Sequence, residues 1–219
     1  MKLYGITYGD KITPFTEYKN NAPSHPHRFE YDPMVYIVAA LQNMRADEHV
    51  GIFSHKFTQK TGFTKQQVEE VIINHGEWPV INFSPNLGNN IGGCGNFMQW
   101  SIKGHGERLR ELLQACCAHV GIDYTEDPEY VIYANQFTAH YPIYLNYINH
   151  VVMPCINLME GPLWDKVNVN ANYVAGLPAD QLQKTNGLQF YNYLPFVLER
   201  MFMMYVATNG FICYNAWKK

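Results

Sequence analysis

Short β-forming runs alternate with helical stretches along the first two thirds of the chain, and this alternation restricts the fold more than any other feature. Apolar and β-branched runs bounded by Gly, Pro or Asn predict strands at residues 2–8, 49–54, 79–84, 130–134 and 210–214. Apolar residues spaced three and four apart predict helices at residues 31–46, 64–74, 107–120, 141–159 and 195–208. We therefore expect an α/β fold: a mostly parallel sheet with flanking helices and a helical C-terminal third.

Several helix ends carry recognisable signals. For the helix at residues 31–46, Asp32 is the predicted N-cap and Pro33 takes the first helical position. Thr64 is a predicted N-cap, and Gly121 is the predicted end of the helix that precedes it. Two stretches read as loops, residues 11–28 with their prolines and residues 85–95 with their Asn and Gly. Long loops of this kind are commonly functional.

The composition is that of one folded domain, and we assign residues 1–219 to it. Of the 219 residues, 47% are hydrophobic and 16% charged, and no apolar stretch approaches the roughly 20 residues of a membrane helix. The net charge of -3 gives no overall attraction to nucleic acid or anionic lipid. The five cysteines show neither a zinc spacing nor a disulfide framework, which predicts reduced thiols and a cytoplasmic protein without membrane contact.

Polar residues follow the predicted strands, where open α/β sheets bind ligands. The densest group is SHKFTQKTGF at residues 54–63, in which Lys56 and Lys60 precede a capped helix and suit a phosphate or diphosphate. The alternative is a loop of solvated lysines in which Thr61 and Gly62 only set up the next helix. The chain lacks GxGxxG, GxxxxGK[ST], GxSxG and HExxH, which removes the commonest nucleotide, hydrolase and zinc-protease readings.

These motifs resemble a bacterial and viral glycosyltransferase-like family. The resemblance covers roughly residues 48 to 205 and is carried by the run at 54–63, the strand and loop at 80–85, Gln99, His105 with Gly106, and residues 133–137. The run Leu198-Glu199-Arg200-Met201 is similar to the glutamate-arginine-leucine ending of small capsule-type enzymes with a GT-A-like fold. The sequence departs from the family at Ser84 before Pro85, at Trp100 after Gln99, and at Gly106 after His105.

The resemblance implies transfer of a sugar from a nucleotide-diphosphate donor to a saccharide or a modified nucleobase in DNA. Glu199, within an apolar helix, is the candidate general base, and His105 is a second acid or base. The candidate donor and phosphate residues are Tyr8, Asp10, Ser54, His55, Lys56, Lys60, Thr61, Asn135 and Gln136. No Asp-x-Asp follows a predicted strand, so Mg²⁺ or Mn²⁺ stays an open expectation, with the lysines as its replacement.

Other interpretations of the sequence remain open. A non-catalytic carbohydrate- or nucleotide-binding module would use the same lysines and the chain's 16 tyrosines without needing Glu199, which would then only pair with a cation such as Arg200. An interaction protein would use its aromatic surface against a partner. A DNA-binding form would need a local basic face, for which the candidates are Lys11, Lys19, Arg28, Lys56, Lys60 and Lys65.

Overall fold

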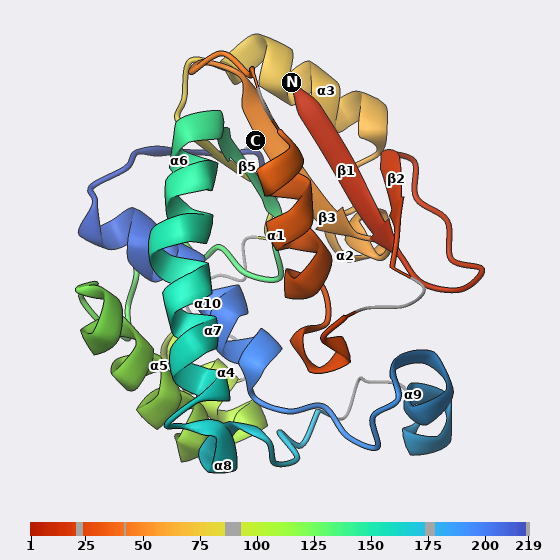
Figure 1. Cartoon of the computed structure of the whole chain (residues 1–219). Coiled ribbons are helices and arrows are strands. Elements are labelled where there is room, and N and C mark those ends of the chain that lie inside the picture. Colours follow the sequence, from red (N-terminus) through yellow and green to blue (C-terminus); the bar gives the residue numbers. More distant parts are fainter. Residues whose placement is uncertain (21–23, 42, 86–92, 174–177, 218–219) are drawn as a thin grey trace.

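The computed structural model describes residues 1–20, 24–41, 43–85, 93–173 and 178–217. A mixed six-stranded sheet, ordered β2-β1-β3-β5-β4-β6, lies between helices on both of its faces (Figure 1). The strands are β1 (Lys2–Thr7), β2 (Thr16–Lys19), β3 (His49–Ser54), β4 (Val80–Asn82), β5 (Phe137–His140) and β6 (Cys213–Asn215). The α/β class is confirmed, but the mostly parallel sheet is not, because β5 runs antiparallel to both of its neighbours, β3 and β4.

The helices alternate with strands in the first part of the chain and follow one another in its C-terminal part. They are α1 (Tyr31–Ala40), α2 (Phe57–Thr61), α3 (Lys65–His75), α4 (Phe97–His105), α5 (Glu107–Val120), α6 (Tyr141–Tyr147), α7 (Met153–Glu160), α8 (Trp164–Val167), α9 (Ala179–Asn186) and α10 (Leu194–Thr208). A 3₁₀ turn, η1 (Pro26–Arg28), precedes α1, and a π-helical segment, η2 (Ile148–Val152), joins α6 to α7. Helices α2, α4, α8 and α9 were not predicted from the sequence.

The core lies on both faces of the sheet because the side chains of a strand alternate between them. Strand β3 is buried along its whole length. Its Val50 and Ile52 belong to the larger core cluster, with α1 and α10, whereas Phe53 packs with Phe57 and with Val68 of α3 in the smaller one. In Figure 1, α1 and α3 accordingly lie on opposite sides of the strands. Burying each such apolar side chain contributes about 1.5–3 kcal/mol to folding.

Helix α1 begins at the predicted residue, but its N-cap is not the predicted Asp32, and it ends earlier than predicted. Its N-cap is Glu30 and its first residue Tyr31, while Asp32 lies inside the first turn, where its carboxylate accepts from His25 and pairs with Arg28. Because that carboxylate is occupied by other partners, it does not cap the helix. The helix stops at Ala40 rather than at residue 46, since the backbone leaves the helical region at the C-cap, Leu41.

Residues 130–134 do not form the predicted strand. Their polar backbone groups bond to side chains instead of to a neighbouring strand: Asn82 donates to the carbonyl of Val131, and the Ser84 hydroxyl accepts from the amide of Tyr133. Ala134 and Asn135 then adopt left-handed backbone with φ of 53° and 55°. This turn directs the chain into β5, so the strand falls immediately after the predicted position.

Other predicted elements agree with the structure. Thr64 caps α3 and forms a capping box with Gln67, and α5 ends at Gly121 in left-handed backbone. The predicted helix at 141–159 is the continuous run α6-η2-α7, and the predicted last strand is β6. The predicted loop at 11–28 contains β2 and η1, and most of the predicted loop at 85–95 lies outside the described residues.

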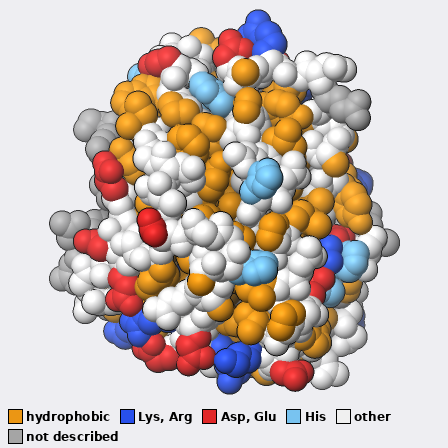
Figure 2. Space-filling view, turned by 60° about the vertical axis from the view of Figure 1, so that its left-hand side comes forward, with side chains coloured by type: hydrophobic (Ala, Val, Ile, Leu, Met, Phe, Trp, Pro, Cys, Tyr) orange, Lys and Arg blue, Asp and Glu red, His pale blue; other side chains and the backbone are white. Residues whose placement is uncertain are grey.

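The surface is lightly charged on the face turned forward in Figure 2, where apolar side chains lie in small groups among uncharged polar ones. Charged side chains are sparse in the middle of that face and gather toward its edges. Within the described part of the chain, no helix has the length and apolar character needed to cross a lipid bilayer. The cysteines that are described are free, and Cys116, Cys117, Cys155 and Cys213 are buried.

Candidate functional site

The carboxyl ends of β1 and β3 lie side by side and bring two polar segments together. The strands are parallel neighbours, with Ile6 opposite Ser54. Tyr8 therefore follows β1 next to the place where His55 follows β3, and their rings meet edge to face at 6.1 Å between centroids. This is the edge at which open α/β sheets bind ligands.

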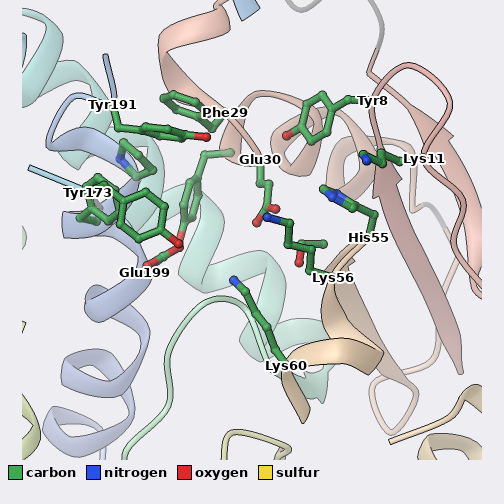
Figure 3. A pocket seen from close by; sticks show the side chains of 14 residues that line it. Tyr8, Lys11, Phe29, Glu30, His55, Lys56, Lys60, Tyr173, Tyr191 and Glu199 are labelled. Atoms are coloured by element: carbon green, nitrogen blue, oxygen red, sulfur yellow. The ribbon is translucent and has the colours of Figure 1, made fainter. Parts of the chain in front are cut away.

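A cavity of about 240 Å³ opens at this edge (Figure 3). It is bounded by the two strand ends, α2, the start of α1 and the first turns of α10. Its lining residues are Tyr8, Lys11, Phe29, Glu30, Tyr31, Ser54, His55, Lys56, Lys60, Tyr173, Tyr191, Pro195, Phe196 and Glu199. Segments that are far apart in the sequence thus contribute aromatic, cationic and acidic side chains to one cavity.

One side of the cavity is an aromatic wall, which we define as Phe29, Tyr173, Tyr191 and Phe196. The ring of Phe29 stacks on that of Tyr191, with centroids 5.0 Å apart and planes at 15°. Tyr173 touches both Tyr191 and Phe196, at 5.2 Å and 5.0 Å. Phe29 adopts φ of 52°, an uncommon conformation for a residue other than glycine. The wall therefore offers a flat apolar surface on which a ring can pack.

The opposite side is cationic. Lys11 comes from the loop after β1, while Lys56 and Lys60 come from the turn after β3 and from α2. Among the residues that the structure describes, none of these three lysines forms a salt bridge. Burial, and then the neighbouring lysines, lower the pKa of His55 to about 4, so its imidazole is neutral at pH 7. The lysine charges are thus available to an anionic ligand.

Glu30 faces the lysines from the start of α1 (Figure 3). Burial raises the pKa of its carboxyl to about 7, and the negative charge of Glu199 acts in the same direction. Lys60, Lys56 and the side chain of Asn135 favour the ionised form and limit the rise. Burial by itself would lower the pKa of Lys60, but the charges of Glu199 and Glu30 outweigh it and raise that pKa. A carboxyl that titrates near neutral pH suits proton transfer.

Glu199 also lines the cavity, from α10, and it has a second role. Its Oε2 lies 3.6 Å from Nη1 of Arg200, a guanidinium that is 4% exposed and that donates from Nη1 to the carbonyl of Phe196. The ring of Phe97 lies 5.8 Å from the same guanidinium carbon. Glu199 therefore provides the negative charge that a buried arginine requires.

The structure brings together some of the predicted site residues and not others. Tyr8, Ser54, His55, Lys56, Lys60 and Glu199 line the cavity. Asp10 is exposed and is not among the lining residues. Thr61 is buried in α2, where its hydroxyl donates to the carbonyl of Phe57. Asn135 and Gln136 are buried and are not among the lining residues, although Oδ1 of Asn135 accepts from the hydroxyl of the lining residue Tyr31.

His105 lies outside the cavity, behind the aromatic wall. It ends α4, its Nδ1 lies 3.0 Å from the carbonyl oxygen of Ala171, and its ring packs at 4.3 Å against that of Phe196. Burial lowers the pKa of this histidine, so it is mainly neutral at pH 7. These contacts favour a role in supporting Phe196 over a direct role as acid or base.

Several lining residues were missed by the sequence reasoning, above all Glu30 and the aromatic wall. Glu30 stands between a proline-rich stretch and a helix whose predicted N-cap was Asp32, so nothing in the local pattern marked it. Tyr173 and Tyr191 fall in the polar span before α10. The only signal that pointed toward them was the abundance of tyrosine, which does not identify particular residues.

The residues present do not fit the Mg²⁺ or Mn²⁺ that the resemblance left open. Hard divalent ions need several oxygen ligands, usually including paired carboxylates. The described part of the chain holds no cluster of three or more His, Cys, Asp or Glu side chains that could bind a metal. Moreover, the two glutamates of the cavity share it with three lysines, whose charges would oppose a cation. The lysines are the cations of this site.

In the comparisons with known proteins, no family model, no curated protein and no solved structure matches the chain. The chemistry of the cavity must therefore indicate its function.

The raised pKa of Glu30 predicts a measurable pH dependence of stability. The pKa of an unfolded glutamate is about 4.3, so the folded protein binds the extra proton up to about pH 7. The contribution of Glu30 to the stability of the parent should therefore fall as the pH rises from about 4.5 to about 7, by about 1.4 kcal/mol per unit of pKa shift. Glu30→Gln has no proton to lose at this position. Over that pH window its free energy of unfolding, measured in urea, should rise relative to that of the parent. Glu111→Gln, at an exposed position of α5, is the control and should show no such gain.

Proposed function

We propose that the protein is a glycosyltransferase that moves a sugar from a nucleoside-diphosphate donor to an acceptor hydroxyl, within the GT-A-like class that its motifs resemble. The observation that supports this most directly is the joining, in one cavity, of three lysines, two glutamates and an aromatic wall. Each of these three groups answers one requirement of sugar transfer.

The first requirement is a site for the diphosphate. Lys56 and Lys60 approach the cavity from the carboxyl end of β3, and Lys11 from the end of β1. Ammonium groups stabilise the charge that builds up on a leaving diphosphate, because their positive charges face it directly. The neutral His55 between them can hydrogen-bond to the same phosphates or to the nucleoside without adding charge.

The second requirement is a proton acceptor, and the third is a surface that orients rings. Glu30 and Glu199 are carboxylates in the same cavity as the lysines. The aromatic wall offers the flat apolar faces on which sugar rings or nucleobases pack. A non-catalytic carbohydrate- or nucleotide-binding module would need the lysines and the aromatic wall but not a carboxyl that titrates near pH 7. That carboxyl favours an enzyme.

The experiment that tests this function is calorimetry with UDP, GDP, CDP and dTDP, followed by transfer assays with the corresponding nucleotide sugars. We expect at least one diphosphate to bind and its sugar form to release nucleotide when an acceptor is present. Binding without release or transfer from any donor would identify a binding module. Absence of binding to every nucleotide would favour the interaction-protein reading.

A further inference from the structure

The cavity is divided between two kinds of surface. Figure 3 shows Lys11, His55 and Lys56 on one side and Phe29, Tyr173 and Tyr191 on the other, with Glu30 between them. The negative charge of a diphosphate favours its binding on the lysine side. The donor then occupies the ends of β1 and β3, and the aromatic wall is left for the other substrate.

We propose that the aromatic wall binds a neutral saccharide acceptor and that Glu30, at the boundary between the two sides, accepts the proton of its attacking hydroxyl. This inference rests on the proposed function. It assigns the proton transfer to a residue that the sequence did not indicate, and it narrows the acceptor to one class.

The position of Glu30 supports the assignment. It immediately follows Phe29, whose ring stacks on Tyr191, so the same turn supplies both a ring of the acceptor surface and the carboxyl. Lys56 and Lys60 lie close enough to stabilise its ionised form, and Glu199 and Asn135 complete the charged and polar groups around it. Glu199, in contrast, is already committed to the buried Arg200.

The reaction balances with these residues alone. The acceptor oxygen forms a bond to the anomeric carbon of the donor sugar, and its proton passes to a carboxylate oxygen of Glu30. The bond from that carbon to the diphosphate oxygen breaks, and the electron pair leaves with the nucleoside diphosphate. The added negative charge of the leaving group appears beside Lys56 and Lys60, while the new positive charge of the hydroxyl is removed at Glu30.

The negative charges beside the aromatic wall favour a neutral saccharide over a nucleic acid as the acceptor. The acceptor side is flanked by Glu30 and Glu199, which would repel a phosphate backbone. Two members of the candidate basic face are also already paired: Arg28 binds Glu160 in a bidentate fashion, and Lys65 pairs with Glu69. A DNA acceptor would have few free cations outside the donor side.

The first arm of the test measures the role of Glu30. Glu30→Gln should lower the rate of transfer at saturating substrates by about 10²- to 10⁴-fold, while its affinity for UDP, or for whichever diphosphate the parent binds, changes less than about threefold. The parental rate should rise with pH through about 7, and this rise should be absent in the variant. Glu111→Gln should keep the parental rate and profile.

The second arm measures the acceptor surface. Tyr191→Ala should raise the acceptor KM about tenfold or more, as expected when a packed aromatic contact is lost, and should leave diphosphate affinity nearly unchanged. The acceptor probes are an array of neutral oligosaccharides and a DNA duplex containing 5-hydroxymethylcytosine. Tyr36→Ala, at an exposed position on α1, is the control.

The outcomes separate the two proposals. If the parent binds no nucleotide or transfers no sugar, the proposed function fails, and this inference fails with it. If the parent transfers sugar but Glu30→Gln does so at the parental rate, only the inference is overturned. Transfer to the DNA probe alone, or a loss of diphosphate affinity in Tyr191→Ala, overturns the assignment of the aromatic wall to a saccharide acceptor.

Discussion

Replacing Lys56 and Lys60 together with alanine should weaken diphosphate binding by about 10²- to 10⁴-fold. Each charge-assisted contact to phosphate contributes about 1.5 to 3 kcal/mol, and 1.4 kcal/mol corresponds to a tenfold change in affinity. Both lysines line the cavity at the carboxyl end of β3. Calorimetry with the diphosphate that binds the parent most tightly measures the effect. The loss should shrink at high ionic strength, since salt screens the parental contacts.

The matched control is Lys2→Ala with Lys166→Ala, which removes the same charge from exposed positions at the start of β1 and in α8. It should bind the diphosphate about as tightly as the parent. Equal affinities of the two double variants would show that Lys56 and Lys60 do not hold phosphate, and the donor site would have to be sought elsewhere.

Phe202→Ala should destabilise the fold by about 3 to 5 kcal/mol, the range for removal of a large buried aromatic side chain. Phe202 is 1% exposed, and its ring stacks on Phe137 with centroids 3.5 Å apart and planes at 9°. Tyr147 packs edge to face on the same ring at 4.9 Å. Through Phe202, α10, which carries Phe196 and Glu199, packs against β5 of the sheet.

Urea unfolding measures this loss, with the same m-value (the slope of unfolding free energy against denaturant) assumed for parent and variant. Ile73→Ala, at a position of α3 that is 71% exposed, is the control and should change stability by less than about 0.5 kcal/mol. A Phe202→Ala protein as stable as the control would mean that the stacked rings contribute little and that α10 is held by other contacts.

Local patterns in the sequence determined the elements whose signals lie within a few residues. The span of β3, the cap of α3 at Thr64 and the end of α5 at Gly121 depend on hydrophobic runs and on capping chemistry, which act locally. The placement of Lys56 and Lys60 after β3 follows for the same reason. Both lysines, and Glu199 within its apolar helix, are therefore recognisable as candidates from the sequence alone.

Only the tertiary structure decided what distant segments do to one another. Asp32 pairs with His25 and Arg28, so it does not cap α1 as the local signal indicates. The side chains of Asn82 and Ser84 bond to residues 130–134, and the strand forms later, as β5, antiparallel to its neighbours. Strand order and direction depend on such long-range contacts, which no local pattern encodes.

The same limit applies to the site. Glu30 has no distinctive sequence context, and its carboxyl titrates near pH 7 because the fold buries it beside Glu199 and opposite two lysines. The aromatic wall joins Phe29 to rings more than a hundred residues away, at positions 173, 191 and 196. Sequence determines which side chains exist, but burial and proximity set their pKa and their partners, and these arise only when the chain folds.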